Sequence, residues 1–125
     1  MKKKERKLLV VDDNIDFVQF IRRALEQEDY RISIALDGKT AIQKASTENP
    51  ELILLDMKLP DMSGEEVFEK VKEVNKDIPV VVITGFVSDT YRSDAFAAHA
   101  DGFLCKPFKV DQIKELLKKH LGCQA

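Results

Sequence analysis

Short apolar runs alternate with longer amphipathic segments five times along this chain, and this rhythm is its strongest constraint on the fold. Leu8–Val11, Leu52–Leu55 and Val80–Ile83 contain apolar residues only. Strands of this kind are buried on both faces, as in a parallel sheet covered by helices. Two further runs, Arg31–Ala35 and Phe103–Cys105, complete the set, and the polar–apolar alternation of Arg31–Ala35 suits an edge strand.

The segments between and after these runs carry apolar residues at helical spacing, with charged residues in between. Five segments are predicted to be helices: residues 15–25, 40–47, 67–74, 88–98 and 110–121. Strands that alternate with helices form a parallel sheet with helices on both faces. The sequence therefore predicts an α/β fold, a doubly wound (βα)5 unit with a five-stranded parallel sheet. In such sheets, ligands bind beyond the carboxyl ends of the strands.

Length and charge restrict the class of protein. The 125 residues suit a single domain, 1–125, with a core at about residues 7–121. A formal net charge of −2 argues against direct nucleic acid binding, because such domains are usually basic. The apolar run that ends at Asp12 is too short for a signal peptide or a membrane span. Cys105 and Cys123 form no C-x-x-C motif, so a disulfide framework is excluded and a reducing, cytoplasmic location is expected.

Polar residues follow four of the five predicted strands. Asp12 and Asp13 follow the first strand, Asp56 the third, Thr84 the fourth and Lys106 the fifth. Because the carboxyl ends of parallel strands share one edge of the sheet, these side chains are predicted to converge. That edge would combine three carboxylates, one hydroxyl and one ammonium group.

This combination suits phosphoryl chemistry. Ionised carboxylates at close quarters repel one another strongly, and a hard cation such as Mg²⁺ removes the repulsion while binding to oxygen ligands. The Lys106 ammonium can pair with a phosphoryl oxygen, and the Thr84 hydroxyl can donate a hydrogen bond to another. A carboxylate can attack phosphorus and form an acyl phosphate. The strand ends therefore predict a Mg²⁺-dependent phosphoryl site.

Each of these residues also has a purely structural interpretation. An Asp after a strand is commonly a helix N-cap or a turn former. A Thr favours strands through its β-branched side chain, and a Lys at a strand end is usually solvated. The chemical interpretation is favoured by the joint occurrence of all five residues at one edge.

The sequence resembles the receiver domain of two-component response regulators. The matching segments, in the order and spacing of that family, are Leu9–Asp13, Leu54–Gly64, Val82–Gly85 and Phe103–Phe108. The loop Leu59–Gly64 and the ending Lys106-Pro107-Phe108 are much more specific than any single Asp. The resemblance implies a flavodoxin-like sheet with strand order 2-1-3-4-5.

The resemblance also implies roles for individual residues. Asp56 would be the phosphoacceptor, phosphorylated by a histidine kinase or a phosphotransfer protein. Asp12, Asp13 and Asp56 would bind Mg²⁺ together with the backbone carbonyl of Lys58. Thr84 and Lys106 would bind phosphoryl oxygens.

The same resemblance implies roles for five positions. Phe103 would be the switch aromatic that moves inward with Thr84, and the peptide bond before Pro107 would be cis. Lys58 and Phe86 would tune how water reaches the phosphoryl group. His99 stands where the family usually has Gly and is expected to be a strained helix cap. Phosphorylation would bias a two-state equilibrium and reshape the surface of helix 88–98, strand 103–105 and helix 110–121.

Such a domain is a signalling switch that catalyses only its own phosphorylation and dephosphorylation. A receiver that acts as a constitutive interaction module is the alternative. An aspartyl-phosphate phosphatase would have D-x-D after its first strand, and a nucleotide-binding domain would have a Gly-rich loop there. Only Gly122–Ala125 follow the last helix, which allows a stand-alone regulator or a receiver cut from a longer protein. The expected partner is a downstream protein target or a missing output domain. Phosphorylation could also drive the formation of a homodimer, and no association with a membrane is expected.

Overall fold

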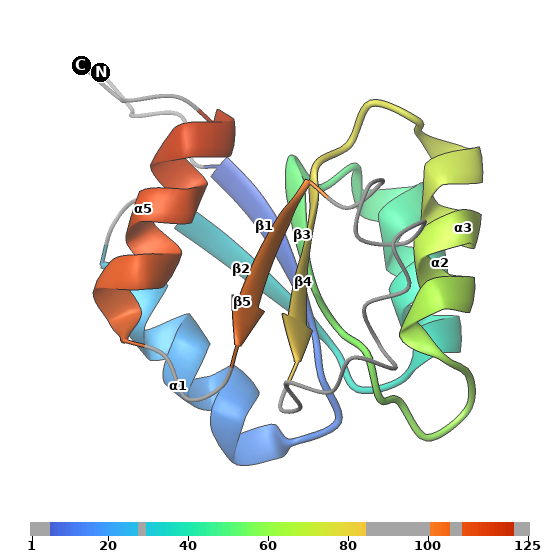
Figure 1. The fold of residues 1–125 in the computed structure, drawn as a ribbon, viewed down its shortest axis with the longest axis horizontal. Coiled ribbons are helices and arrows are strands. Elements are labelled where there is room, and N and C mark those ends of the chain that lie inside the picture. Colours follow the sequence, from blue (N-terminus) through green and yellow to red (C-terminus); the bar gives the residue numbers. More distant parts are fainter. Residues whose placement is uncertain (1–5, 28–29, 85–100, 106–108, 122–125) are drawn as a thin grey trace.

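The computed structural model describes residues 6–27, 30–84, 101–105 and 109–121 (Figure 1). Its sheet has the strand order β2-β1-β3-β4-β5, and every adjacent pair is parallel. The strands are β1 (Arg6–Val11), β2 (Tyr30–Ala35), β3 (Leu52–Asp56), β4 (Val80–Thr84) and β5 (Gly102–Cys105). The predicted parallel α/β class and the order 2-1-3-4 of the first four strands are confirmed, and β5 pairs beside β4.

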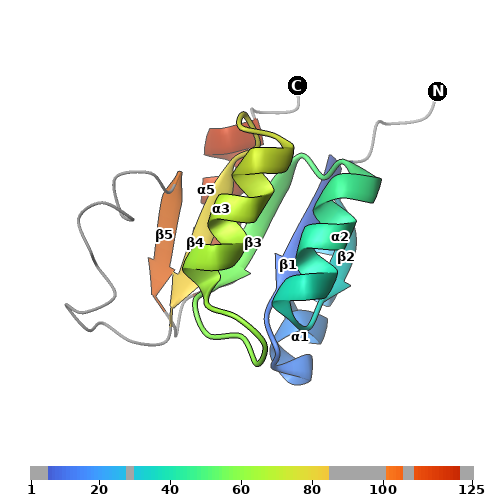
Figure 2. The same ribbon diagram turned by 90° about the vertical axis from the view of Figure 1, so that its right-hand side faces the viewer.

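Helices cover both faces of this sheet. The described helices are α1 (Ile15–Glu26), α2 (Gly38–Glu48), α3 (Gly64–Val74) and α5 (Val110–Leu121). Helices α1 and α5 pack on one face, whereas α2 and α3 lie side by side on the other (Figures 1 and 2). The predicted helix 88–98 and His99 lie outside the described residues. Within the described ranges, the helices are too short and too polar to cross a bilayer.

The apolar strands explain how the two helical layers are held to the sheet. Successive side chains of a strand point to opposite faces. In β1, Leu8 and Val10 pack towards α1 and α5, whereas Leu9 and Val11 pack towards α2 and α3. All four are at most 1% exposed, so neither face of β1 tolerates a polar residue. An uninterrupted apolar run is therefore what a central strand of this fold needs.

The start of α2 differs from the prediction. The sequence suggested a turn at Asp37-Gly38 and a helix from Thr40, but the helix begins at Gly38 with Asp37 as its N-cap. The backbone N–H of Thr40 donates to the Asp37 carboxylate at 2.7 Å. The same Asp-Gly pair serves a turn or a helix start, and the helix start prevails because this side chain caps it. The predicted break at Asn49 is confirmed, with Asn49 in the left-handed region at φ 49°.

Lys72 and Asp101 tie the amino-terminal ends of β4 and β5 to α3. The Lys72 ammonium donates to the backbone carbonyl of Ile78 at 2.6 Å and to Asp101 at 3.1 Å. The same Asp101 oxygen accepts the backbone N–H of Val80 at 2.8 Å. One ion pair thus fixes two strand starts to a helix end.

Adjacent residues of α1 test this packing. Ile21 is fully buried, and its replacement in Ile21→Ala should lower the free energy of unfolding by about 2 to 5 kcal/mol, through lost burial and a residual cavity. Phe20 is 50% exposed, so Phe20→Ala should lower it by less than about 1 kcal/mol. Urea unfolding curves measure both values. Equal losses for the two variants would contradict the orientation of α1.

Candidate functional site

The register of β1 against β3 brings two carboxylates to the same level. Val11 pairs with Leu55, so the residues that follow them, Asp12 and Asp56, lie at the carboxyl edge of adjacent strands. This edge is at the lower end of the sheet in Figure 1. Carboxylate oxygens of Asp12, Asp13 and Asp56 all lie within 4.8 Å of one another. The predicted convergence of the three acids is therefore present in the structure.

The β1–α1 turn fixes the first two of these acids. The backbone N–H of Asn14 donates to the Asp12 carboxylate at 2.9 Å, and the Asn14 side chain caps α1 by accepting the N–H of Phe17 at 3.1 Å. Asp12 is 1% exposed and Asp56 is 7% exposed, whereas Asp13 is exposed. Two of the three like charges are thus largely removed from water, which strengthens their mutual repulsion.

The donor set suits a divalent cation. Neighbouring and opposite ligands of an octahedral Mg²⁺ are about 2.9 and 4.1 Å apart, given metal–oxygen distances of about 2.0 to 2.1 Å. The three carboxylate oxygens, all within 4.8 Å of one another, are close to this spacing. Carboxylates are the ligands that Mg²⁺ prefers, and its charge offsets the repulsion among the three acids.

The loop that follows β3 closes tightly on the end of that strand. Lys58 and Ser63 form an isolated antiparallel bridge, and the N–H of Gly64 donates to the carbonyl of Met57 at 3.0 Å. A Cβ on Gly64 would lie 2.7 Å from the Met57 Cα and 3.0 Å from the Asp56 carbonyl oxygen. Only glycine permits this approach, so Gly64 lets α3 begin directly against the strand that carries Asp56.

The other predicted site residues are only partly described. Thr84 is the last residue of β4 and follows Ile83, the partner of Asp56 in the sheet, so its backbone lies at the same edge. Phe103 lies in β5 opposite Val82. The side chains of Thr84 and Phe103 lie outside the description, as do residues Phe86, Lys106 and Pro107.

Sequence reasoning assigned no role to Asp61, which the structure joins to α2. The backbone N–H groups of Gly38 and Lys39 donate to its two carboxylate oxygens at 2.7 and 2.9 Å. These two bonds stabilise the charged form and lower the pKa of Asp61 below its ordinary value of 3.8. The partners are 23 and 22 positions away along the chain, so no local pattern signals the contact.

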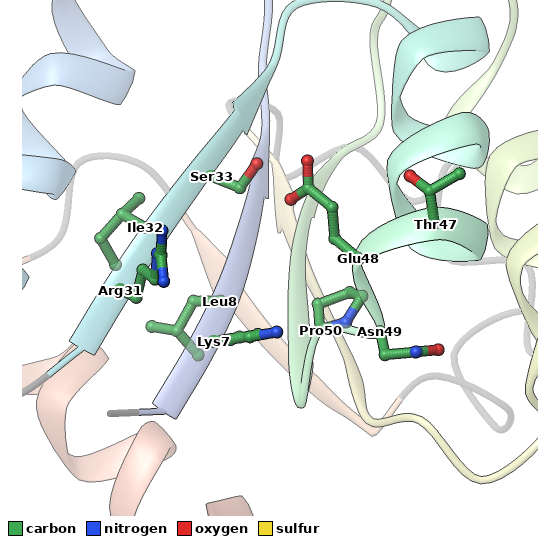
Figure 3. Close-up of a pocket in the computed structure, with 9 residues that line it drawn as sticks. All are labelled: Lys7, Leu8, Arg31, Ile32, Ser33, Thr47, Glu48, Asn49 and Pro50. Atoms are coloured by element: carbon green, nitrogen blue, oxygen red, sulfur yellow. The ribbon is translucent and has the colours of Figure 1, made fainter. Parts of the chain in front are cut away.

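A pocket of about 470 Å³ lies at the other end of the sheet (Figure 3). Lys7, Arg31 and Ser33 border it from β1 and β2, and Glu48 borders it from α2. It opens near the amino-terminal ends of these strands, away from the three carboxylates. The pocket is therefore separate from the acidic edge.

Fold and site together define a flavodoxin-like α/β domain with a three-carboxylate edge suited to a divalent cation. The profile of the family described as response regulator receiver domain matches residues 8–118. The chain therefore belongs to the response regulator receiver domain family.

Individual relatives agree with this assignment. The chain is 36% identical over 119 residues to response regulator ArlR of Staphylococcus saprophyticus, covering 94% of this chain and 53% of that protein. It is 30% identical over 115 residues to sporulation initiation phosphotransferase F of Bacillus subtilis, covering 92% and 93%. The crystal structure of response regulator protein TrrA from Thermotoga maritima, in complex with Mg²⁺-BeF, matches with a TM-score of 0.83 at 33% identity, covering 91% and 97%. The chain thus spans about half the length of ArlR and several other curated relatives.

Removing one acid should stabilise the metal-free fold. Without divalent cations, Asp13→Asn should raise the free energy of unfolding by about 1 kcal/mol, because it relieves repulsion within the cluster. Added Mg²⁺ should stabilise the wild type more than this variant. Urea unfolding with chelator and with Mg²⁺ measures both effects. Asp77→Asn, an exposed change outside the cluster, is the charge-matched control and should shift stability by less than about 0.5 kcal/mol.

The lowered pKa of Asp61 predicts a pH-dependent contribution to stability. Because the folded-state pKa lies below the ordinary value of 3.8, the contribution is complete above 3.8 and is lost as the pH falls through the folded-state pKa. Asp61→Asn should therefore be less stable than the wild type near neutral pH, and the difference should shrink in acid. Urea unfolding of both proteins, from neutral to acidic pH, measures this difference in the free energy of unfolding. A difference that stays constant down to the lowest pH would contradict the hydrogen-bonded carboxylate.

Proposed function

We propose that this chain is a phosphoacceptor receiver domain in which Asp56 takes a phosphoryl group from a histidine kinase or phosphotransfer protein in a Mg²⁺-dependent reaction. The convergence of Asp12, Asp13 and Asp56 within 4.8 Å at the carboxyl edge carries this proposal. Membership of the receiver family supports it, because receivers are the switch components of two-component signalling.

The transfer needs a fixed nucleophile and a compensated charge. An oxygen of Asp56 attacks the donor phosphorus, the new O–P bond forms as the P–N bond breaks, and the departing imidazole nitrogen keeps the electron pair and takes a proton. Asp56 is the last residue of β3, and the strand backbone holds it in place. Asp12, Asp13, Asp56 and the Lys58 carbonyl would bind Mg²⁺, which neutralises charge on the transferring group.

The remaining family positions complete the proposed switch. Thr84 and Lys106 bind phosphoryl oxygens of the product, and Phe103 follows Thr84 inward. Lys58 and Phe86 tune the access of water, and the bond before Pro107 is cis. The complete domain is a (βα)5 unit that signals through predicted helix 88–98, β5 and α5. The position of the Thr84 backbone at the acidic edge supports this arrangement.

The proposed setting is a cytoplasmic domain of residues 1–125, with its core at about 7–121. Its output passes to a protein target or to an output domain, because relatives such as ArlR extend well beyond the matched region. Phosphorylation is the proposed trigger for a homodimer through the same surface, and the domain makes no direct contact with nucleic acid.

Intact-mass measurement after incubation with acetyl phosphate tests the acceptor. The wild type should gain one phosphoryl group with Mg²⁺ and none with chelator, because the cation offsets charge at the acidic edge. Asp56→Asn should gain no phosphoryl group, since an amide is a poor nucleophile. Asp77→Asn, which removes an exposed loop charge, should gain the group as the wild type does.

A wild type that binds Mg²⁺ but shows no gain, in a measurement fast enough for a short-lived product, would contradict the phosphoacceptor role. That outcome would favour the constitutive interaction module. A phosphoryl gain that persists in Asp56→Asn would show that another residue is the acceptor.

A further inference from the structure

Helix α2 receives part of its N-terminal capping from a distant loop. The first N–H groups of a helix lack partners within the helix. In α2, Thr40 donates to the Asp37 carboxylate and Ala41 to the Asp37 carbonyl, whereas Gly38 and Lys39 donate to Asp61. Of the described helices, α2 is the one without an acidic residue in its first turn, so Asp61 supplies a negative charge that favours the helix dipole.

Asp61 stands in the loop between β3 and α3, which also carries Lys58. The Lys58–Ser63 bridge closes the base of this loop, and the Gly64–Met57 hydrogen bond holds the base against β3. Asp61 lies between the two bridge residues in the chain. Hydrogen bonds that hold Asp61 in place therefore also restrict the backbone of Lys58, which lies three residues before Asp61. Lys58 itself lies two residues after Asp56.

Apolar contacts keep the same loop against the core but do not set its exact position. Leu59 and Met62 pack against the core on the α2 and α3 side. A Cβ on Gly38 would overlap the Met62 side chain, so glycine at the helix start admits Met62 closely. Apolar burial is non-directional, whereas two hydrogen bonds to adjacent N–H groups fix both distance and direction. The position of the loop along α2 thus depends on the Asp61 carboxylate.

We propose that Asp61 is a positioning residue for the cation site: by holding the 58–63 loop on the first turn of α2, it keeps the Lys58 backbone placed for Mg²⁺ binding. This inference rests on the proposed function. Groups that orient metal ligands without touching the metal commonly control affinity. Asp61 acts through the loop, while the three carboxylates remain anchored by β1 and β3.

A charge-matched pair of variants at the same helix end tests the role. Asp61→Asn replaces one of two acceptor oxygens by a donor, so one of its two bonds to α2 is lost. Asp37→Asn removes the same charge but keeps a good N-cap, because Asn accepts from the helix N–H as Asp does. Both variants lose one negative charge at the same helix end, so Asp37→Asn controls for the effect of that charge loss on Mg²⁺ binding.

The measurement is the Mg²⁺ dissociation constant by isothermal titration calorimetry of the folded, unphosphorylated protein. Asp61→Asn should weaken binding about tenfold, at the lower end for groups that orient ligands. Asp37→Asn should weaken it by no more than about threefold, as expected for one partly exposed charge. Amide hydrogen exchange without Mg²⁺ should accelerate at Gly38 or at Lys39 in Asp61→Asn only, because one of these two N–H groups loses its acceptor.

The outcomes separate this inference from the proposed function. Equal weakening in both variants, with Mg²⁺ binding and phosphorylation of the wild type intact, would overturn the role of Asp61 and leave the phosphoacceptor function standing. Unchanged exchange at Gly38 and Lys39 in Asp61→Asn would also overturn it. A wild type that binds no Mg²⁺ would overturn both.

Discussion

The pairing of β1 with β3 is the constraint on which the rest of this structure depends. With Val11 opposite Leu55, the next residue on each strand is an aspartate, and both reach the edge together. A slip of one residue would turn every side chain of the strand to the other face, and both faces are packed by helices. Burial therefore holds the register, so the apolar core also determines where the charges of the site meet.

The acidic edge opposes the stability that this core provides. Three carboxylates within 4.8 Å repel one another, and two of them are almost fully buried. Apolar burial on both faces of the sheet and well-capped helices offset that repulsion. A site that stores unfavourable charge gains the most from a cation, because binding then relieves repulsion as well as forming new bonds. The same repulsion would therefore lower local stability without the cation and favour the binding of Mg²⁺.

Sequence analysis succeeded where one physical signal dominated. Uninterrupted apolar runs identify central strands, and the polar residues that end them identify the edge, so Asp12, Asp13 and Asp56 were predicted to meet. It failed where two local patterns compete or where the contact is distant in sequence. Asp37-Gly38 suits both a turn and a helix start, and only the capping bond decides between them. The contacts of Asp61 and of Lys72 with Asp101 join segments separated by 22 to 29 positions, for which a single sequence carries no pattern.

Strand register and the contacts of the loop after β3 each position a different part of the site. Strand register places the carboxylates of β1 and β3 rigidly, because moving either would disturb the core. The loop after β3 is held by other contacts. The Lys58–Ser63 bridge closes its base, its own Leu59 and Met62 side chains pack against the core, and Asp61 accepts N–H groups from the start of α2. A hydrogen-bonded carboxylate on a helix end supplies the directional restraint that apolar packing lacks. Changes at the start of α2 are therefore expected to affect the proposed cation site through this loop, by way of Asp61.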